Sequence, residues 1–317
     1  MRVLITGATG LVGSRVAQRL VGRGHTLRLG SRSASQSVLP DDQESVLTDW
    51  GDEASLYDAC RGMDAVVHAA GMNAQDAAAD PVAALAINGL GSALLATAAR
   101  RAGVGRLLYF STAHVYASPL TGTISEDDSP TNLHPYASSH LAGEYALRQA
   151  GQAGGLQVLA LRLSNAFGAP LQANANCWGL LANDLCRQIS EQGQMRLSTG
   201  GLQWRDFIPL TAVSDVVAQL LEADADLNEF GVLNLGGRAM RVIDMAQLIQ
   251  ARSEVLFGHT PRLERPSVLS TSEASQLDFR CDRLARVVAA PVLDMEGEVD
   301  ALLRFCATHF GTQERPA

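Results

Sequence analysis

Gly7-Ala8-Thr9-Gly10-Leu11-Val12-Gly13 follows the apolar run Arg2-Val3-Leu4-Ile5-Thr6 and opens a stretch of helical period. Glycine lets the backbone turn sharply and approach a pyrophosphate, and a helix that begins there offers free N–H groups to the anion. A strand, a glycine-rich turn and a helix in this order form the context that a dinucleotide-binding fingerprint requires. The alternative is a turn that only packs helix on strand, and the spacing G-x-x-G-x-x-G differs from the common G-x-G-x-x-G. We expect dinucleotide phosphates to bind here, to Gly7, Thr9, Gly10, Leu11, Val12 and Gly13.

Short apolar runs alternate with longer stretches of helical period through the first half of the chain, which is typical of a doubly wound parallel sheet. The expected strands are 2–6, 26–30, 45–47, 65–68, 106–110 and 158–162, and the expected helices are 11–21, 54–60, 81–101 and 136–149. After Gly168 the sequence becomes irregular and rich in Asn and Gly, until strand patterns return at 207–210 and 232–235 around a helix at 214–221.

These patterns predict an α/β protein with a Rossmann-like doubly wound parallel sheet and a smaller, discontinuous C-terminal substrate lobe. Residues 1–168 would form the dinucleotide-binding domain, which the chain re-enters at about 207–240. Residues 169–206 and 241–317 would form the substrate-binding lobe.

Composition excludes several classes of function. The 317 residues carry a formal charge of -8 without a basic stripe, so we expect no nucleic-acid partner. No apolar run reaches the roughly 18 to 20 residues that span a bilayer, and the chain opens in a strand pattern without a signal peptide. We therefore expect a cytoplasmic protein without a membrane partner. The five cysteines are far apart and lack C-x-x-C spacing, so no metal is expected.

The end of the second expected strand selects the dinucleotide. It reads Leu29-Gly30-Ser31-Arg32-Ser33, without the carboxylate that usually binds the ribose of NAD. Ser31 and Arg32 suit a 2'-phosphate, because a guanidinium can fork onto phosphate oxygens. NADP is therefore the expected cofactor, with NAD and a merely solvated arginine as the alternative. Further cofactor contacts are expected from Asp49 and Trp50, beside the adenine, and from Ala69, Ala70 and Gly71, where the dinucleotide crosses the sheet.

Several motifs in order resemble the extended short-chain dehydrogenase/reductase family that acts on nucleotide sugars, and the resemblance covers nearly the whole chain. They are the Gly7 loop, His68-Ala69-Ala70-Gly71, Asn88, the segment from Ser111 to Tyr116, Tyr136-x-x-x-His140, the segment from Leu161 to Gly168, and Trp204-Arg205-Asp206-Phe207-Ile208. The resemblance implies that Thr112 holds the reacting hydroxyl or carbonyl of the substrate and that Tyr136 moves the proton. It also implies that Asn88, Tyr136 and residue 140 contact the cofactor.

Histidine stands at position 140, where this family carries a lysine, and the chain contains no lysine that could replace it. The family's lysine lowers the pKa of the tyrosine, which is otherwise about 10. His140 shares a helix face with Tyr136, but an ordinary pKa of about 6.5 leaves it only partly charged at neutral pH. Three interpretations stay open: a working enzyme with histidine substituted, a tyrosine activated by the charge of the nicotinamide, or a protein that binds cofactor without turnover.

Three further residues are implicated on the substrate side. His114 stands where a fucose-synthesising relative has an acid/base cysteine, so it is a candidate acid/base group or a histidine that only packs beneath the sugar. Dehydratases of the family carry Asp-Glu directly after the threonine, whereas this chain has Ala113-His114. By resemblance, Asn165 and Arg205 bind the substrate near its diphosphate. The alternative for Arg205 is a salt bridge with Asp206.

The resemblance implies an NAD(P)-dependent nucleotide-sugar epimerase or 4-ketoreductase, which transfers hydride at a ring carbon with Tyr136 as acid/base. The alternative is a catalytically weak NADP(H)-binding sensor or partner protein, which the missing lysine supports. A homodimer through helices 81–101 and 136–149 is expected by analogy with relatives.

Overall fold

Seven parallel strands form the central sheet, in the order β11-β7-β5-β4-β1-β2-β3. The computed structural model describes residues 1–32, 43–266 and 275–311, so Ser33 lies outside the described residues. The strand order reverses between β1 and β4, which places the glycine-rich turn after β1 at the switch point where such sheets bind ligands. The predicted fold class is therefore confirmed. The strands are β1 Arg2–Thr6, β2 Thr26–Ser31, β3 Glu44–Leu47, β4 Ala65–His68, β5 Arg106–Thr112, β7 Gln157–Leu163 and β11 Val232–Leu235.

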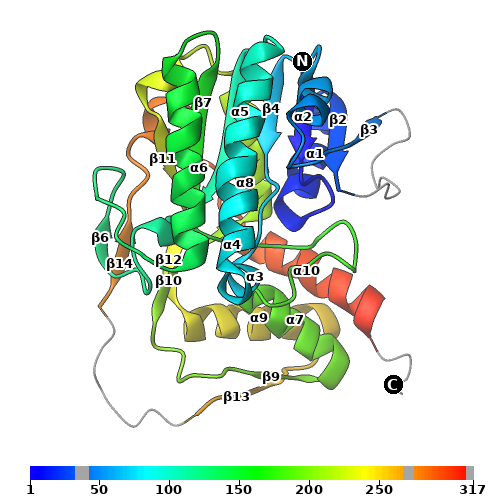
Figure 1. Ribbon diagram of the computed structural model, residues 1–317. Coiled ribbons are helices and arrows are strands. Elements are labelled where there is room, and N and C mark those ends of the chain that lie inside the picture. Colours follow the sequence, from blue (N-terminus) through cyan, green and yellow to red (C-terminus); the bar gives the residue numbers. More distant parts are fainter. Residues whose placement is uncertain (33–42, 267–274, 312–317) are drawn as a thin grey trace.

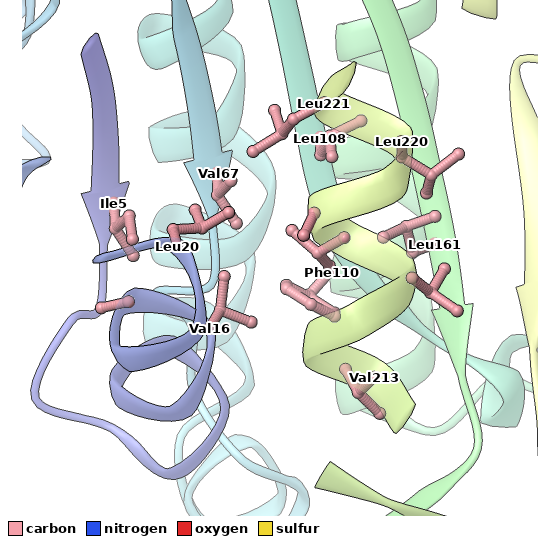
Figure 2. Close-up of a cluster of buried hydrophobic side chains, with 14 of the residues drawn as sticks. Ile5, Val16, Leu20, Val67, Leu108, Phe110, Leu161, Val213, Leu220 and Leu221 are labelled. Atoms are coloured by element: carbon pink, nitrogen blue, oxygen red, sulfur yellow. The ribbon is translucent and has the colours of Figure 1, made fainter. Parts of the chain in front are cut away.

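Helices cover both faces of this sheet because successive strand side chains point to opposite sides. Ile5 and Val67 pack against α1 (Leu11–Gly22) and α8 (Leu210–Glu222), and Figure 2 shows the side chains of these two helices meeting those of the strands. Residues of opposite parity, such as Leu4 and Val66, face the other layer. That layer contains α2 Glu53–Cys60, α5 Ser92–Arg101 and α6 Pro135–Gln152, the last two lying in front of the sheet in Figure 1.

The helix expected at 81–101 contains a π-helical segment. It runs as α4 (Pro81–Ala84), η1 (Leu85–Gly91) and α5, and Asn88 lies inside the π segment. The segment packs closely at its end, since a Cβ on Gly91 would lie 3.3 Å from the ring of Trp50. By length and composition this helix is apolar enough to cross a membrane, contrary to our expectation that no run would be. Half of it is buried inside the protein, as in a core helix.

A second group of elements gathers below the sheet in Figure 1. There α7 (Leu181–Gln192), α9 (Val242–Phe257) and α10 (Met295–Phe310) share a hydrophobic cluster. The strand expected at 207–210 belongs to this region: β10 pairs with β8 and β12, so the chain returns to the main sheet only with β11. The exact division into domains stays a prediction. The remaining elements are α3 Ala74–Ala79, η2 Ala113–Val115, η3 Leu227–Glu229, η4 Leu284–Arg286, β6 Gly122–Ile124, β8 Asn165–Phe167, β9 Gln194–Arg196, β10 Trp204–Pro209, β12 Arg238–Arg241, β13 Arg262–Glu264 and β14 Leu277–Phe279.

A buried carboxylate joins α1 to α10. Glu298 accepts hydrogen bonds from Arg15 Nη1 at 2.8 Å and from the Thr211 hydroxyl at 2.6 Å. Arg15 also donates to the carbonyl of Ala169 at 2.9 Å. The helix that follows the glycine-rich turn is thereby fixed to the elements below the sheet.

A second buried ion pair holds α6 against the sheet. Arg162 of β7 donates to Glu144 of α6, with Nη2 to Oε2 at 2.7 Å, and both side chains are almost fully buried. The Ser111 hydroxyl donates to the same carboxylate at 2.5 Å, and the Arg162 guanidinium lies 4.6 Å from the centroid of the Tyr116 ring. Because α6 also carries Tyr136 and His140, this pair sets the position of both.

Candidate active site

The glycine-rich turn has the geometry of an anion cradle. Gly7 adopts a φ of +69°, in the left-handed region that favours glycine. A Cβ on Gly13 would lie 2.3 Å from the carbonyl oxygen of Gly7, so the helix can begin this close to the turn only with glycine there. The N-cap residue Gly10 gives α1 no side-chain cap, which leaves the first N–H groups of α1 available to a ligand. These residues fit the phosphates of a dinucleotide.

Substitution of Gly13 tests this cradle. We expect Gly13→Ala to weaken dinucleotide binding by tenfold or more, about 1.4 kcal/mol, because the new methyl group displaces the Gly7 carbonyl. Gly22→Ala is the matched control, since a Cβ at Gly22, in the same helix, meets no atom within 4 Å. Titration calorimetry with NAD and NADP measures both. If both variants bound the dinucleotides equally well, the assignment of this turn as a phosphate-binding site would be contradicted.

The residues expected beside the adenosine lie at the ends of β2 and β3. Arg32 is exposed and Ser31 is half-buried. Asp49 is also exposed, and its Oδ1 accepts a hydrogen bond from the Gly51 N–H at 2.9 Å. The Trp50 ring stacks on His68 with centroids 5.2 Å apart, so much of its surface is engaged within the protein. Cofactor contacts by these four residues stay predictions.

Asn88 connects the segment after β4 to α6. Its Oδ1 accepts from Met72 N at 2.8 Å, and its Nδ2 donates to Ser139 Oγ at 3.0 Å. The predicted Ala69-Ala70-Gly71 stretch lies beside it, since a Cβ on Gly71 would be 3.0 Å from Asn88 Oδ1. Asn88 therefore positions the backbone where the dinucleotide is expected to cross the sheet.

The structure brings Thr112 and Tyr136 together at the carboxyl end of β5. Tyr136 lies in the first turn of α6, where its N–H donates to Nδ1 of the N-cap residue His134 at 3.2 Å. Its hydroxyl shares a hydrogen bond with that of Thr112, which is itself buried. Burial raises the pKa of Tyr136, and the bond to Thr112 lowers it by less. The phenol therefore stays protonated at neutral pH unless a bound ligand changes its surroundings.

His140 lies directly against Tyr136, with ring centroids 4.7 Å apart, and is 6% exposed. Burial lowers its pKa to about 4, so it is neutral at pH 7. The partial positive charge expected from an ordinary histidine pKa is therefore wrong for this site, because the desolvation of the ring disfavours its charged form. His140 Cε1 would lie 3.7 Å from a Cβ on Gly71, which places the ring beside the expected path of the dinucleotide.

His114, Asn165 and Arg205 form a second group on neighbouring elements. The half-buried His114 has a lowered pKa, mainly because of burial and secondarily because of the charge of Arg205, while a hydrogen bond with the Asn165 side chain opposes this shift. Asn165 Nδ2 also donates to the Asp206 carbonyl at 2.8 Å. The Asp206 carboxylate accepts from Ser164 Oγ at 2.5 Å and from Gly237 N at 2.7 Å. Within the described part of the chain the alternative Arg205–Asp206 salt bridge is absent, because these neighbours point to opposite sides of β10.

Sequence reasoning missed the contacts among a set of buried polar residues behind Thr112 and Tyr136. Tyr109 contacts His140, His68 contacts Thr6 and Ser92, and Glu144 pairs with Arg162. The available signal was a polar side chain within an otherwise apolar strand, as at His68 and Tyr109. In the described ranges no three His, Cys, Asp or Glu side chains are grouped so as to hold a metal ion.

The parallel sheet carries a glycine cradle at its switch point, and beside the cradle a tyrosine faces a threonine. Together these features define a dinucleotide-dependent enzyme of the short-chain dehydrogenase/reductase type. Residues 3–236 match the model of the NAD dependent epimerase/dehydratase family. The chain belongs to this family, which confirms the resemblance predicted from its motifs.

Curated relatives agree with this assignment. The chain is 34% identical over 177 residues to a UDP-glucose 4-epimerase of Azospirillum brasilense, an alignment that covers 53% of this chain and half of that protein. It is 27% identical over 301 residues to a UDP-glucose 4-epimerase of Neisseria meningitidis serogroup C, covering 85% and 87% of the two chains. It is 30% identical over 265 residues to the dTDP-6-deoxy-L-talose 4-dehydrogenase (NAD(P)(+)) of Kitasatospora kifunensis, covering 80% of each.

Solved structures support the fold. The UDP-glucose 4-epimerase of Thermotoga maritima, solved with UDP-glucose, has a TM-score of 0.78 at 19% identity and covers 96% of this chain and 98% of its own. The Thermus thermophilus UDP-glucose 4-epimerase in complex with NAD has a TM-score of 0.77 at 23% identity and covers 96% and 99%. At these identities the likeness establishes the fold alone.

Proposed function

We propose that the protein is a nucleotide-sugar 4-epimerase that works with a bound nicotinamide dinucleotide. The observation that carries the proposal is the Tyr136–Thr112 hydroxyl pair, at the edge of the sheet where the glycine cradle also lies. The UDP-glucose 4-epimerases among the relatives suggest a UDP-sugar as the substrate class.

Each residue has a distinct part in this proposal. Thr112 would bind the 4-hydroxyl of the sugar. Tyr136 would accept the proton of that hydroxyl as a phenolate, a form that the positive charge of a bound, oxidised nicotinamide would favour, and would return the proton to the same oxygen at the end of the turnover. The dinucleotide, held at the glycine cradle, would supply the reversible hydride acceptor that epimerisation at C4 requires. Arg205, exposed beside His114 and Asn165, suits the diphosphate because a guanidinium forks onto two phosphate oxygens. His114 is placed to contact the sugar from this side.

The first experiment is to purify the protein without added cofactor, denature it and identify any released dinucleotide by mass and absorbance. An epimerase never needs to exchange its cofactor, so we expect a near-stoichiometric amount. The same preparation is incubated with UDP-glucose and with UDP-N-acetylglucosamine, and the products are separated by anion-exchange chromatography. An empty protein that binds NADPH reversibly and interconverts neither sugar would overturn the epimerase proposal.

A 4-ketoreductase is the second candidate, and Arg32 is the observation that favours it. A reductase exchanges its cofactor after each turnover and commonly draws on NADPH, which an exposed arginine after β2 would recognise by its 2'-phosphate. The His140→Lys variant distinguishes the third candidate, a sensor without turnover, from an enzyme. An enzyme changes its rate in that variant, whereas a sensor shows no turnover before or after it.

Arg32 also provides a test of cofactor choice. We expect Arg32→Ala to weaken NADPH binding at least about tenfold, because one charge-assisted contact to phosphate is lost. NADH binding to the same variant is the internal control and should stay within a factor of two of wild type. Fluorescence titration measures both dissociation constants. An equal loss for NADH and NADPH would mean that Arg32 does not read the 2'-phosphate.

The assembly of the protein is also proposed. Apolar side chains stay exposed along α4, η1 and α6, which favours a homodimer through these helices. They are Val82, Leu85, Leu90 and Tyr145. Light scattering after size exclusion should give twice the chain mass of 33.6 kDa, and a monomer would contradict the proposal. We further propose a cytoplasmic enzyme, built from the two lobes predicted above.

A further inference from the structure

A row of aromatic rings runs from Trp50, which follows β3, to Tyr136. Successive ring centroids lie 5.2, 5.2, 5.8 and 4.7 Å apart. Hydrogen bonds accompany the row, from Thr6 Oγ1 to His68 Nδ1 at 2.7 Å, from His68 Nε2 to Ser92 Oγ at 2.9 Å, and from Tyr109 Oη to His140 Nδ1 at 2.8 Å. The rings are those of Trp50, His68, Tyr109, His140 and Tyr136.

The position of each proton at the inner end of this network can be deduced. The Ser92 hydroxyl donates to the Asn88 carbonyl at 2.6 Å, so its oxygen can only accept from His68. His68 therefore carries its proton on Nε2, and its Nδ1 accepts from the Thr6 hydroxyl. Burial lowers the pKa of His68 to about 3, which keeps the ring neutral with a single proton.

The same reasoning applies to Tyr109 and His140. Tyr109 is 1% exposed, and burial raises its pKa, so the phenol keeps its proton and needs an acceptor. Ser92 also lies near the phenol and affects its pKa, but the hydrogen bond that satisfies both distance and angle joins the phenol oxygen to His140 Nδ1, at 2.8 Å. A phenol is a good donor and an unprotonated imidazole nitrogen a good acceptor, so Tyr109 donates to Nδ1. A neutral imidazole has one N–H, which must then be on Nε2.

We infer that the Tyr109 hydroxyl fixes His140 in the tautomer with its proton on Nε2, so that an imidazole N–H acts where the family's lysine would act. Tyr109 is thus a positioning residue, and His140 is the group that presents a donor to the cofactor ribose. This inference rests on the proposed function for its catalytic consequence. It explains how the site can keep the hydrogen-bonding part of the lysine's role without its charge.

The approach of α6 to β5 is built for this contact. Gly143 lies one turn after His140, and a Cβ there would be 2.8 Å from Tyr109 Oη and 2.6 Å from the Asn88 carbonyl oxygen. Any larger residue would separate the helix from the phenol. Glycine at this position therefore permits the Tyr109–His140 hydrogen bond.

Nitrogen NMR of the cofactor-free protein tests the tautomer without reference to turnover. Long-range ¹H–¹⁵N spectra of protein labelled in histidine distinguish protonated from unprotonated ring nitrogens, and His140→Gln identifies the His140 signals. We expect Nε2 protonated and Nδ1 unprotonated at pH 7. A proton on Nδ1, or on both nitrogens, would overturn the inference.

Tyr109→Phe tests the cause of the tautomer. We expect its His140 signals to shift toward a mixture of the two tautomers, while the His68 signals stay unchanged and report an intact core. Tyr116→Phe is the matched control, because it removes another buried phenol, whose hydroxyl donates to Asn234 Oδ1 at 2.7 Å. The control should leave the His140 signals as in wild type. A single unshifted tautomer in Tyr109→Phe would refute the positioning role.

Kinetics separate this inference from the proposed function. We expect Tyr109→Phe to reduce kcat about tenfold or more, with the KM for the sugar nucleotide within threefold of wild type, because a misplaced catalytic donor slows the chemical step. If wild type shows the expected tautomer but converts no nucleotide sugar, the proposed function fails and the tautomer assignment stands. If kcat of the variant is unchanged, the positioning role in catalysis fails alone.

Discussion

Tyr136→Phe is expected to reduce turnover by about 10²- to 10⁴-fold, the range that one positioned acid/base group contributes. The variant keeps the ring that packs against His140 and loses only the hydroxyl that meets Thr112. Dinucleotide affinity should therefore stay within a few-fold of wild type. Steady-state rates with a nucleotide sugar and calorimetric binding of the dinucleotide measure the two effects separately.

Tyr145→Phe provides the control for this substitution. Tyr145 lies on the same helix, but this residue is 58% exposed and comes nine residues after Tyr136. It should leave kcat and binding unchanged. If Tyr136→Phe retained more than a tenth of the wild-type rate, another group would have to move the proton, and the assignment of Tyr136 would fail.

Arg162→Met is expected to lower the free energy of unfolding by about 3–5 kcal/mol. The substitution leaves Glu144 buried without its cation, and an uncompensated carboxylate in the interior is strongly unfavourable. Urea denaturation followed by circular dichroism measures the change. Because α6 also carries Tyr136 and His140, activity at room temperature should fall with the folded fraction.

Two variants control for the buried pair. Removing both charges, as Arg162→Met with Glu144→Leu, should recover most of the loss, since neither charge is then left alone. Arg280→Met removes one half of an exposed pair with Asp278, where both side chains are more than half exposed, and should cost about 1 kcal/mol or less. Equal losses in the free energy of unfolding for Arg162→Met and Arg280→Met would contradict the conclusion that burial makes the loss of one charge costly.

The elements that sequence analysis predicted well are those set by local patterns. The strands at 2–6, 65–68 and 232–235 match β1, β4 and β11 at both ends, because short buried strands read as continuous apolar runs. The glycine-rich turn was also predictable, since Gly7 adopts a positive φ and Gly13 has no room for a Cβ beside the Gly7 carbonyl. The roles of Tyr136 and Thr112 came from the resemblance to the family rather than from a local pattern, and they stay predictions.

What the sequence could not supply depends on contacts between distant segments. The charge of His140 is set by its burial, and its tautomer by Tyr109, 31 residues earlier on β5. The placement of β10 in a separate sheet likewise follows from its pairing with β8 and β12. Local propensity contains no information on any of these, because each depends on which surfaces meet after folding.

The π segment at Leu85–Gly91 also sets the rotational phase of the helix that contains it. Each residue of an α-helix advances by about 100° around the axis, and each residue of the wider π turn advances by less. If these seven residues took up the regular α-helical repeat at the same length, α5 would therefore turn relative to α4. Ser92 would then point away from His68, and the apolar stripe of α5 would leave the core. Deleting one residue from the segment would offset that rotation, so we expect a shortened, α-helical segment to keep the contacts of α5 with the core, whereas a deletion within α5 itself would break them.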